Sequence, residues 1–271
     1  MRLAGYVIHG NSAATLGPCL DSLAAVCDEV VAVDSCSSDG SAELVRARGL
    51  RSVIHPWEGY GAARAEAVRA LGPCDYVFFL DSDEYLLPEA QAAIRAWKDT
   101  SPRVPHVTLV RRDWAELPTR RFLFREERHV RLVRRDAATW SPSMVVHEAL
   151  PPRETAALDA FIEHRFVTSV AQRHDKEDRY ALIWALRATA EGWRRKPVWP
   201  QRIVHTFRNG VAKGALFRGG CDGLVLAWNV SRYHARKHLY LAEVERGEHA
   251  EALRALREGR LRDLYRIVGL A

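Results

Sequence analysis

The chain has 271 residues, of which 48% are hydrophobic, so it can bury the core of one large domain with an appendage. It contains no run of 18 or more apolar residues, which excludes a predicted membrane-spanning helix, and no signal peptide is apparent. The net charge of +6 fits contact with nucleic acid, a membrane surface or a phosphorylated acceptor, or simply an Arg-rich composition.

Strands and helices are predicted to alternate along the first hundred residues. Strand-like apolar runs cover residues 3–8, 30–33, 52–54 and 76–80, and helical patterns cover residues 16–26, 41–48, 61–71 and 88–98. This order predicts a parallel, right-handed, doubly wound sheet. After residues 102–105 the pattern changes to Arg-rich strands at 107–111, 122–124 and 129–133, and from about residue 175 the chain is predicted to be helical.

An acidic tripeptide, Asp81-Ser82-Asp83, directly follows the apolar run 76–80. A run of this kind is typical of a strand buried on both faces, and open α/β sheets bind ligands at the carboxyl ends of such strands. Two carboxylates this close repel each other unless a cation lies beside them, and Mg²⁺ and Mn²⁺ prefer oxygen ligands. The pattern indicates a metal site at Asp83 and Asp81, against the simpler interpretation of a solvated turn.

A second acidic loop follows the strand-like residues 29–33. It contains Asp34, Asp39 and Gly40, and Ser41 is predicted to cap the next helix. These residue types make ordinary turns. Alternatively, Asp34 and Asp39 accept hydrogen bonds from a nucleotide's base or ribose beside the helix N-terminus.

These motifs together resemble the donor half of glycosyltransferase family 2, along the path from Tyr6 through Asp34-Ser35-x-Ser-x-Asp39-Gly40 to Asp81-Ser82-Asp83-Glu84. The resemblance implies an inverting, metal-dependent enzyme that uses a nucleotide sugar with Mg²⁺ or Mn²⁺. It implies the GT-A type of fold, an α/β, Rossmann-like, doubly wound, mostly parallel sheet with a smaller β region and a C-terminal helical extension.

Three later segments are similar to the branch that contains lipopolysaccharide core β-1,4-glucosyltransferases. They are Val146-His147-Glu148, residues 164–180 and residues 219–224. This resemblance implies UDP-glucose as donor and a saccharide or lipid-linked saccharide as acceptor. It also implies a donor-binding half at 1–100, an acceptor half at 101–174 and a helical extension at 175–271.

Gly59 and Gly61 lead into a predicted helix and would bring Arg64 towards a predicted diphosphate site. An ordinary strand-to-helix turn explains the two glycines equally well. Members of the resembled family often have Asn after this basic residue, whereas this chain has Ala65. Many also have Asn-Glu where this chain has Asn11-Ser12. The two departures concern the donor contacts rather than the fold.

Glu148 is the candidate general base. It follows an apolar pair, and burial would raise the pKa of a carboxyl group towards neutrality. His147 is expected to orient Glu148 or to bind metal or phosphate. A His-Glu pair after a strand is more often a surface turn, and the family resemblance reverses that preference. We expect Glu148 to deprotonate an acceptor hydroxyl while Asp83 and Asp81 hold the metal against the donor diphosphate.

Further basic and aromatic residues are candidate phosphate contacts. Lys176 and Tyr180 are four residues apart and share a helix face, from which they would reach leaving-group phosphates, unless the segment is a solvated helix start. Arg131 and Arg134 fall on opposite faces of a strand, so only one of them can face a site.

The C-terminal helical region carries a membrane hypothesis. Residues 224–244 mix apolar and aromatic side chains with Arg232, Arg236 and Lys237, which is typical of a helix on an anionic bilayer or of a helix packed on the main domain. The five cysteines lack the pairing of a zinc site and indicate reduced thiols. We therefore expect a cytoplasmic location, with possible peripheral contact at the membrane face.

Three alternative functions would each require other features of the sequence. A sugar nucleotidyltransferase also uses acids and a metal, but a Gly-rich phosphate loop would be expected where this chain has residues 9–12. A nucleic-acid-binding protein would carry a recognisable reader motif, and none is found, so no nucleic-acid partner is expected. A non-catalytic sugar-binding relative would be expected to lack the acids that this chain retains.

Overall fold

The computed structural model describes residues 1–118, 120–142, 145 and 150–270, and the chain forms two compact units. The first unit comprises Met1–Asp113 and Glu126–Arg165. The second comprises Trp114–Arg125 and the chain from Phe166 onward. No helix in the described ranges has both the length and the apolar character needed to cross a bilayer.

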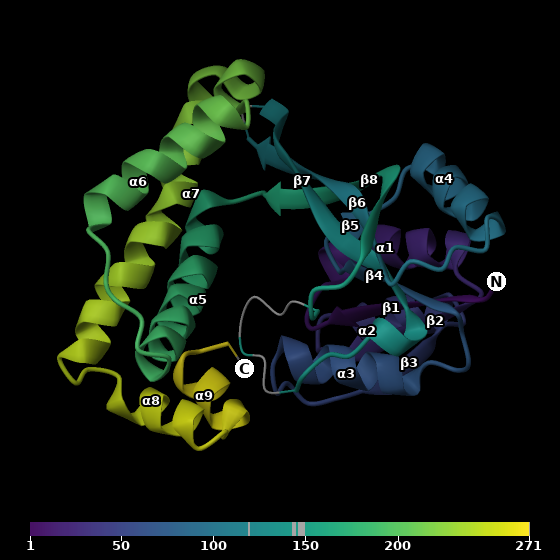
Figure 1. The fold of residues 1–271 in the computed structure, drawn as a ribbon, viewed down its shortest axis with the longest axis horizontal. Helices are drawn as coiled ribbons and strands as arrows, with labels where there is room; N and C mark the ends of the chain where they lie inside the picture. The colour runs from purple at the N-terminus through teal and green to yellow at the C-terminus, as the bar shows by residue number, and fades with distance from the viewer. Residues whose placement is uncertain (119, 143–144, 146–149, 271) are drawn as a thin grey trace. The chain divides into compact units, whose positions relative to one another are not determined.

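A sheet of eight strands organises the first unit, in the order β3-β2-β1-β4-β7-β6-β8-β5 (Figure 1). Strands β1 to β4 are parallel, whereas β7 is antiparallel to β4 and β8 is antiparallel to β5. The strands are β1 Leu3–His9, β2 Glu29–Asp34, β3 Arg51–Ile54, β4 Tyr76–Asp81, β5 Glu84–Tyr85, β6 His106–Leu117, β7 Arg120–Arg134 and β8 Thr155–Val167.

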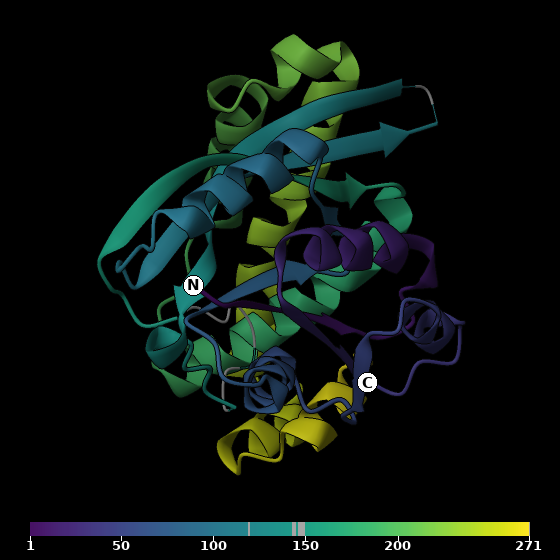
Figure 2. The same ribbon diagram turned by 90° about the vertical axis from the view of Figure 1, so that its right-hand side faces the viewer.

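Helices cover both faces of the parallel strands (Figures 1 and 2). Strand β1 is buried along its whole length, and its successive side chains point to opposite faces. Leu3 and Val7 pack in one apolar cluster with α1, α2 and α4, while Ala4 and Tyr6 pack in a second cluster with α3. The helices are α1 Ala13–Val26, α2 Ser41–Ala47, α3 Tyr60–Ala70 and α4 Pro88–Asp99.

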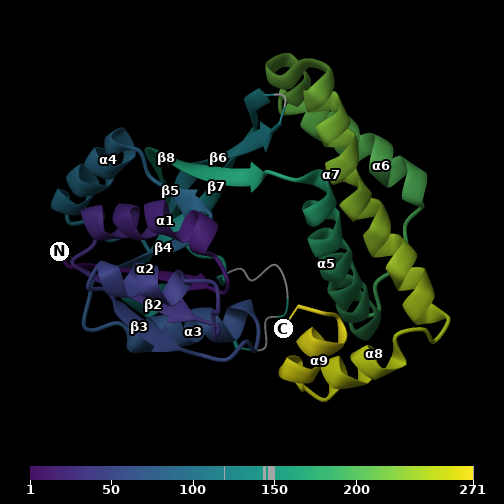
Figure 3. The ribbon, with the colours of Figure 1, turned by 180° about the vertical axis from the view of Figure 1, so that it is seen from behind.

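The second unit is mainly helical (Figure 3). Its long helix α7 bends at Gly220, whose backbone has φ 58° and ψ −139°. A side chain at Gly219 would begin 2.5 Å from the ring of Phe122, so only glycine permits this approach. The helices are α5 Val170–Ala190, α6 Val198–Phe207, α7 Ala215–Glu245, α8 Ala250–Arg257 and α9 Leu261–Ile267, with a π-helical turn at Arg208–Ala212.

The predicted α/β class, with parallel strands wound by helices on both faces, is confirmed. Three local predictions need correction. Helix α1 begins at Ala13, three residues earlier than predicted. Gly40, not Ser41, caps α2, because Ser41 is already helical and its hydroxyl donates to Asp39 at 2.6 Å. The short strands predicted at 122–124 and 129–133 are one strand, β7, and β8 was not predicted.

Candidate active site

The carboxyl ends of β1, β2 and β4 bring both acidic loops to one edge of the sheet. His9 at the end of β1 is in register with Asp34 of β2, and Ile8 is in register with Asp81 of β4. From β1 the chain moves outward to β2 and β3, and β4 then pairs with the other side of β1. Open α/β sheets bind ligands where the strand order reverses in this way.

Asp34 is buried and organises the loop that follows it. Its Oδ1 atom accepts hydrogen bonds from the N–H (2.8 Å) and the hydroxyl (2.6 Å) of Ser37. His9 Nδ1 lies 3.8 Å from the same oxygen, and burial lowers the pKa of His9. The loop is also tied to the loop after β1, because Asn11 N–H donates to Ser37 Oγ at 3.0 Å and Ser38 N–H donates to Asn11 Oδ1 at 2.8 Å.

Asp39 binds the first residues of two helices. Its Oδ1 accepts from the hydroxyl (2.6 Å) and the N–H (3.1 Å) of Ser41 at the start of α2, and its Oδ2 accepts from Ala13 N–H at 2.9 Å at the start of α1. The hydrogen bond from Ser41, with that from Ala13, lowers the pKa of Asp39. The carboxylate therefore joins the two loops, and its predicted contact with a nucleoside stays a prediction.

Asp81 lies between two guanidinium groups. Arg64 Nη2 donates to Oδ1 at 2.7 Å, and Arg131 Nη2 donates to Oδ2 at 2.9 Å. Burial alone would raise the pKa of Asp81, but Arg131 and Arg64 together hold it well below its ordinary value. Arg64 is buried and lies about 5 Å from the ring centres of Phe79 and Trp140. Both carboxylate oxygens of Asp81 are thus engaged by arginine.

Glu84 lies beneath this pair and is almost fully buried. Its Oε1 accepts from Arg131 Nη2 at 2.5 Å and lies 3.5 Å from Arg111 Nη1, while its Oε2 accepts from the N–H of Asp81 at 3.1 Å. Burial raises the pKa of Glu84. Arg131 therefore neutralises two carboxylates at once, and its loss would leave a buried charge poorly compensated.

Asp83 faces an imidazole. Its Oδ2 lies 3.5 Å from His164 Nε2, and His164 Nδ1 lies 2.7 Å from Oδ1 of the buried Asp113. Burial alone would lower the pKa of His164, but the carboxylate of Asp83 and the hydrogen bond to Asp113 raise it to about 9. Arg111 Nε in turn donates to Asp113 at 2.8 Å.

This arrangement fits a divalent cation. If the ring is neutral with Nδ1–H donated to Asp113, the Nε2 lone pair of His164 is aimed at the side of the ring where Asp83 lies, a geometry common among metal-binding histidines. Cations such as Mg²⁺ take few protein ligands and complete their shell with phosphate oxygens and water. Asp83 and His164 would hold the ion, and the proton on His164 would leave when it binds. Asp81, predicted as a second ligand, accepts hydrogen bonds from arginine at both oxygens, and its metal role stays a prediction.

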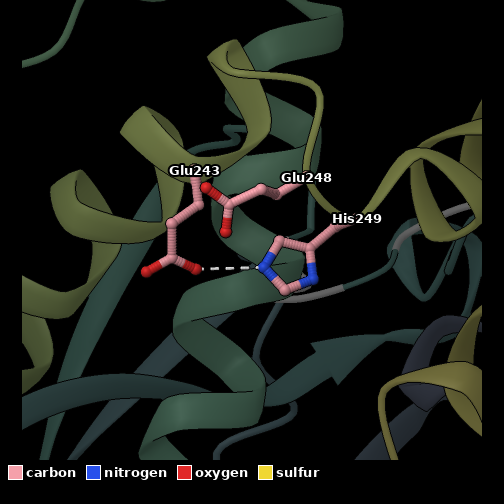
Figure 4. A group of neighbouring side chains, drawn as sticks. All are labelled: Glu243, Glu248 and His249. Atoms are coloured by element: carbon pink, nitrogen blue, oxygen red, sulfur yellow. Dashed lines mark hydrogen bonds and ion pairs between the residues drawn. The ribbon is translucent and has the colours of Figure 1, made fainter.

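A tighter acidic group lies in the second unit. Among the residues that the structure describes, Glu243, Glu248 and His249 form the one group of three metal-ligand types whose ligand atoms lie within 4.8 Å of one another (Figure 4). His249 Nε2 lies 3.0 Å from Glu243 Oε2, and Glu248 pairs with Arg246 at 2.7 Å. These contacts close the turn between α7 and α8, which accounts for the group without a ligand.

The remaining predicted site residues are distributed as follows. Lys176 and Tyr180 lie on α5 in the second unit, with the Lys176 ammonium 5.8 Å from the centre of the Tyr180 ring, and their phosphate role stays a prediction. His147 and Glu148 lie outside the described residues. Arg131 faces the site while Arg134 pairs with Asp136 at 2.6 Å, as the alternation along a strand predicts.

Sequence reasoning missed the residues that surround the acidic tripeptide. From the sequence, His164 is only the first residue of the segment 164–180, and Glu84 is only the end of a motif. Arg111 and Asp113 alternate with Arg112 on β6, which places them on one face of the strand. That alternation was visible in the sequence, but it does not reveal which partner strand supplies His164.

The chain is similar in sequence to known glycosyltransferases. A family model described as "Glycosyl transferase family 2" matches residues 7–150. A lipopolysaccharide core biosynthesis glycosyltransferase, LpsC, of Rhizobium meliloti is 29% identical over 258 residues, which cover 86% of this chain and 89% of that protein. An uncharacterized glycosyltransferase of Rickettsia felis is 30% identical over 93 residues, or 34% of this chain and 32% of that protein.

A solved structure of glucosyl-3-phosphoglycerate synthase from Mycobacterium tuberculosis, with Mn²⁺, UDP and glucosyl-3-phosphoglycerate bound, is 24% identical to this chain. The match covers 41% of this chain and 44% of that one, with a TM-score of 0.35. A similarity of this size adds nothing to the assignment of the site.

Proposed function

Since this chain belongs to glycosyl transferase family 2 and is a glycosyltransferase, we propose that it transfers glucose from UDP-glucose to a hydroxyl group of a saccharide acceptor. The proposed acceptor class is lipopolysaccharide core or a related cell-envelope glycan, on the cytoplasmic side of the membrane. The relative that aligns over most of both chains carries a name from lipopolysaccharide core biosynthesis, which supports this class. The choice of UDP-glucose rests on the resemblance of residues 146–148, 164–180 and 219–224 to glucosyltransferases.

The observation that carries the proposal is the pairing of Asp83 with His164 beside Asp81, at the carboxyl end of β4. A bound Mg²⁺ or Mn²⁺ there would supply Lewis-acid stabilisation of the departing diphosphate. Asp83 and His164 would position it, and Asp113 would keep the imidazole oriented.

The two arginines on Asp81 have a distinct part in this proposal. They fix the Asp81 side chain, and we propose that their positive charge helps to stabilise the negative charge that a departing diphosphate would gain. Asp34 and Asp39 would hold the nucleoside at the neighbouring loops, and Lys176 and Tyr180 would contact the phosphates.

Inversion requires an acceptor hydroxyl to attack the anomeric carbon from the side opposite the diphosphate. Glu148 is proposed to take the hydroxyl proton during this attack, with His147 as its neighbour. The bond to the UDP oxygen breaks as the new glycosidic bond forms, and the proton ends on Glu148.

A donor screen followed by a turnover assay tests the proposal. Thermal unfolding is measured with UDP-glucose, UDP-galactose, GDP-mannose and CMP-sialic acid in the presence of Mn²⁺, because a ligand that binds the folded state raises the unfolding temperature. UDP release is then followed with lipopolysaccharide core oligosaccharide as acceptor. The proposal expects the largest shift and acceptor-dependent release with UDP-glucose. A larger shift with another nucleotide sugar would overturn the donor, and UDP release indifferent to the oligosaccharide would overturn the acceptor.

A further inference from the structure

Helix α6 exposes an apolar side. Trp199 is 64% exposed, Ile203 61%, Val204 58% and Phe207 62%. Trp199, Ile203 and Phe207 are four residues apart, so they follow one stripe of the helix, and Val204 lies beside it. A surface helix of a water-soluble domain normally turns such a stripe inward.

The opposite side of α6 is polar and faces α7. The Arg202 guanidinium lies 3.6 Å from the centre of the Trp228 ring, and the His205 ring stacks on His234 at 3.3 Å. The side-chain oxygen of Thr206 on the same helix is buried and has no hydrogen-bond partner among the residues that the structure describes. The polar side of α6 therefore faces the rest of the helical unit, and its apolar side is exposed.

The first half of α7 extends the exposed surface. Cys221, Leu224, Val225 and Trp228 are all exposed, and their spacing of three, one and three residues places them on one side of the helix. The rings of Trp199 and Trp228 are 6.4 Å apart, which joins the two helices, and α6 lies along α7 (Figures 1 and 3). We call this the α6–α7 apolar face, made of Trp199, Ile203, Val204, Phe207, Leu224, Val225 and Trp228.

The same segment holds the excess positive charge of the protein. Residues 192–221 contain seven of the 40 Lys and Arg and none of the 34 Asp and Glu, so the rest of the chain is close to neutral, with 33 basic and 34 acidic residues. Arg194, Arg195 and Lys196 are exposed directly before α6, and Arg208 is exposed at its end. The apolar face is thus flanked by cations at both ends of the helix.

The basic residues that the sequence assigned to lipid contact lie elsewhere. Arg232 and Arg236 of α7 both pair with Asp178 of α5, at 2.6 and 3.0 Å. Burial lowers the pKa of Lys237 to about 8. These three side chains make their contacts within the helical unit, Lys237 with the ring of Tyr233 at 4.3 Å. The membrane hypothesis therefore shifts to α6 and the start of α7, and of residues 224–244 it keeps Leu224, Val225 and Trp228.

We propose that the α6–α7 apolar face docks on an anionic lipid bilayer, with its tryptophans and Phe207 in the interface and the flanking cations on the headgroups. Amphipathic helices bind bilayers in this way when aromatic residues and basic residues occur together. A second copy of this chain is a poorer occupant, because the same cations would face each other across the interface. The inference goes beyond the proposed function and does not depend on it, because docking needs neither donor nor acceptor.

Vesicle sedimentation of the full chain, without nucleotide sugar, tests the docking. Vesicles of phosphatidylcholine alone are compared with vesicles that also contain phosphatidylglycerol. We expect binding to the second kind, weakened by added salt, with a blue shift of tryptophan emission that Trp199→Phe reduces.

Matched variants separate the two contributions. Ile203→Ser with Phe207→Ser should weaken binding by roughly tenfold or more for each side chain removed from the interface. The control is Ile54→Ser on β3, which is 72% exposed and outside the face. Arg194→Ala with Arg195→Ala should weaken binding about thirtyfold, from about 1 kcal/mol for each basic residue near an anionic surface. The control is Arg254→Ala with Arg257→Ala, which are exposed on α8.

Two results would overturn the proposal. One is sedimentation that is equal for both kinds of vesicle or equal for face and control variants, with circular dichroism showing that all are folded. The other is a wild-type dimer in analytical ultracentrifugation that Ile203→Ser with Phe207→Ser converts to a monomer, without vesicle binding by either protein. That second result would assign the face to self-association. Neither would bear on sugar transfer, which is measured separately.

Discussion

Replacing Arg131 with methionine tests the buried charge cluster behind the acidic tripeptide. Methionine keeps an unbranched apolar stem, so the change mainly removes the guanidinium group. Arg131 is buried and contacts Asp81 at 2.9 Å and Glu84 at 2.5 Å through one nitrogen. Asp81 keeps Arg64 at 2.7 Å, whereas Glu84 keeps the uncharged N–H of Asp81 at 3.1 Å and the longer 3.5 Å approach of Arg111. The cost therefore falls chiefly on Glu84.

We expect Arg131→Met to lower the free energy of unfolding by roughly 3–5 kcal/mol at neutral pH, which is typical when one partner of a buried ion pair is removed. Urea titration followed by circular dichroism measures this loss. The double variant Arg131→Met with Glu84→Gln should recover much of it, because no buried carboxylate then remains unpaired. Arg134→Met, three residues further along β7 and at the surface, is the control and should cause no comparable loss.

The pH dependence of this deficit has a definite sign. Burial already raises the pKa of Glu84, and loss of the Arg131 charge raises it further. A carboxyl group with a raised pKa in the folded state takes up a proton on folding, so its cost appears as the pH rises above the unfolded-state value of about 4.3. The deficit of Arg131→Met should thus be largest near neutral pH and shrink towards pH 4. A deficit that is independent of pH, or that Glu84→Gln does not reduce, would refute this account of the cluster.

Three other predictions concern the metal, the base and the packing of β1. Asp83→Asn should weaken UDP binding in the presence of Mn²⁺ at least tenfold, and the remaining affinity should not change when a chelator is added, as measured by calorimetry. If the wild-type protein keeps its affinity for UDP in excess chelator, the metal role of Asp83 is wrong. Glu148→Gln should lower kcat roughly 10²–10⁴-fold with little change in donor affinity, and near wild-type turnover would move the search for a base to Asp113 and Glu116. Gly5→Ala would place a methyl group 2.6 Å from Cys27 Sγ and should lower the free energy of unfolding by about 1–3 kcal/mol, measured by urea titration. If the clash causes this loss, adding Cys27→Ala to the variant should relieve it.

The parallel strands were predictable because strands that are buried on both faces appear in the sequence as continuous apolar runs. Strands β1 and β4 are covered on both faces, so nearly every residue in them is apolar. Strand β8 was missed because exposed residues are interspersed with buried ones along it and one of its buried residues, Glu163, is charged. A buried charge needs a nearby partner, and the sequence pattern does not predict that His164, about eighty residues further along the chain, is the partner of Asp83.

The candidate site also contains residues that the sequence predicts and residues that it does not. Asp34, Asp81 and Asp83 were found because they stand at strand ends, where position alone suggests a ligand. Their different environments depend on Arg64, Arg131 and His164, which come from three other elements. The inverted pattern of α6 was also missed, because a periodic apolar stripe predicts a helix face but does not say whether that face points inward.

The bonds between the loops after β1 and β2 have a consequence for affinity. Asp39 joins the first turns of α1 and α2, and Asn11 exchanges hydrogen bonds with Ser37 and Ser38. Neither loop can shift without disturbing the other, so the ligand-binding edge is preorganised. If a nucleoside binds there, as proposed, it would lose little free energy to ordering of the backbone, and more of its contact energy would remain as affinity. For the same reason, an insertion in either loop would loosen both helix starts together.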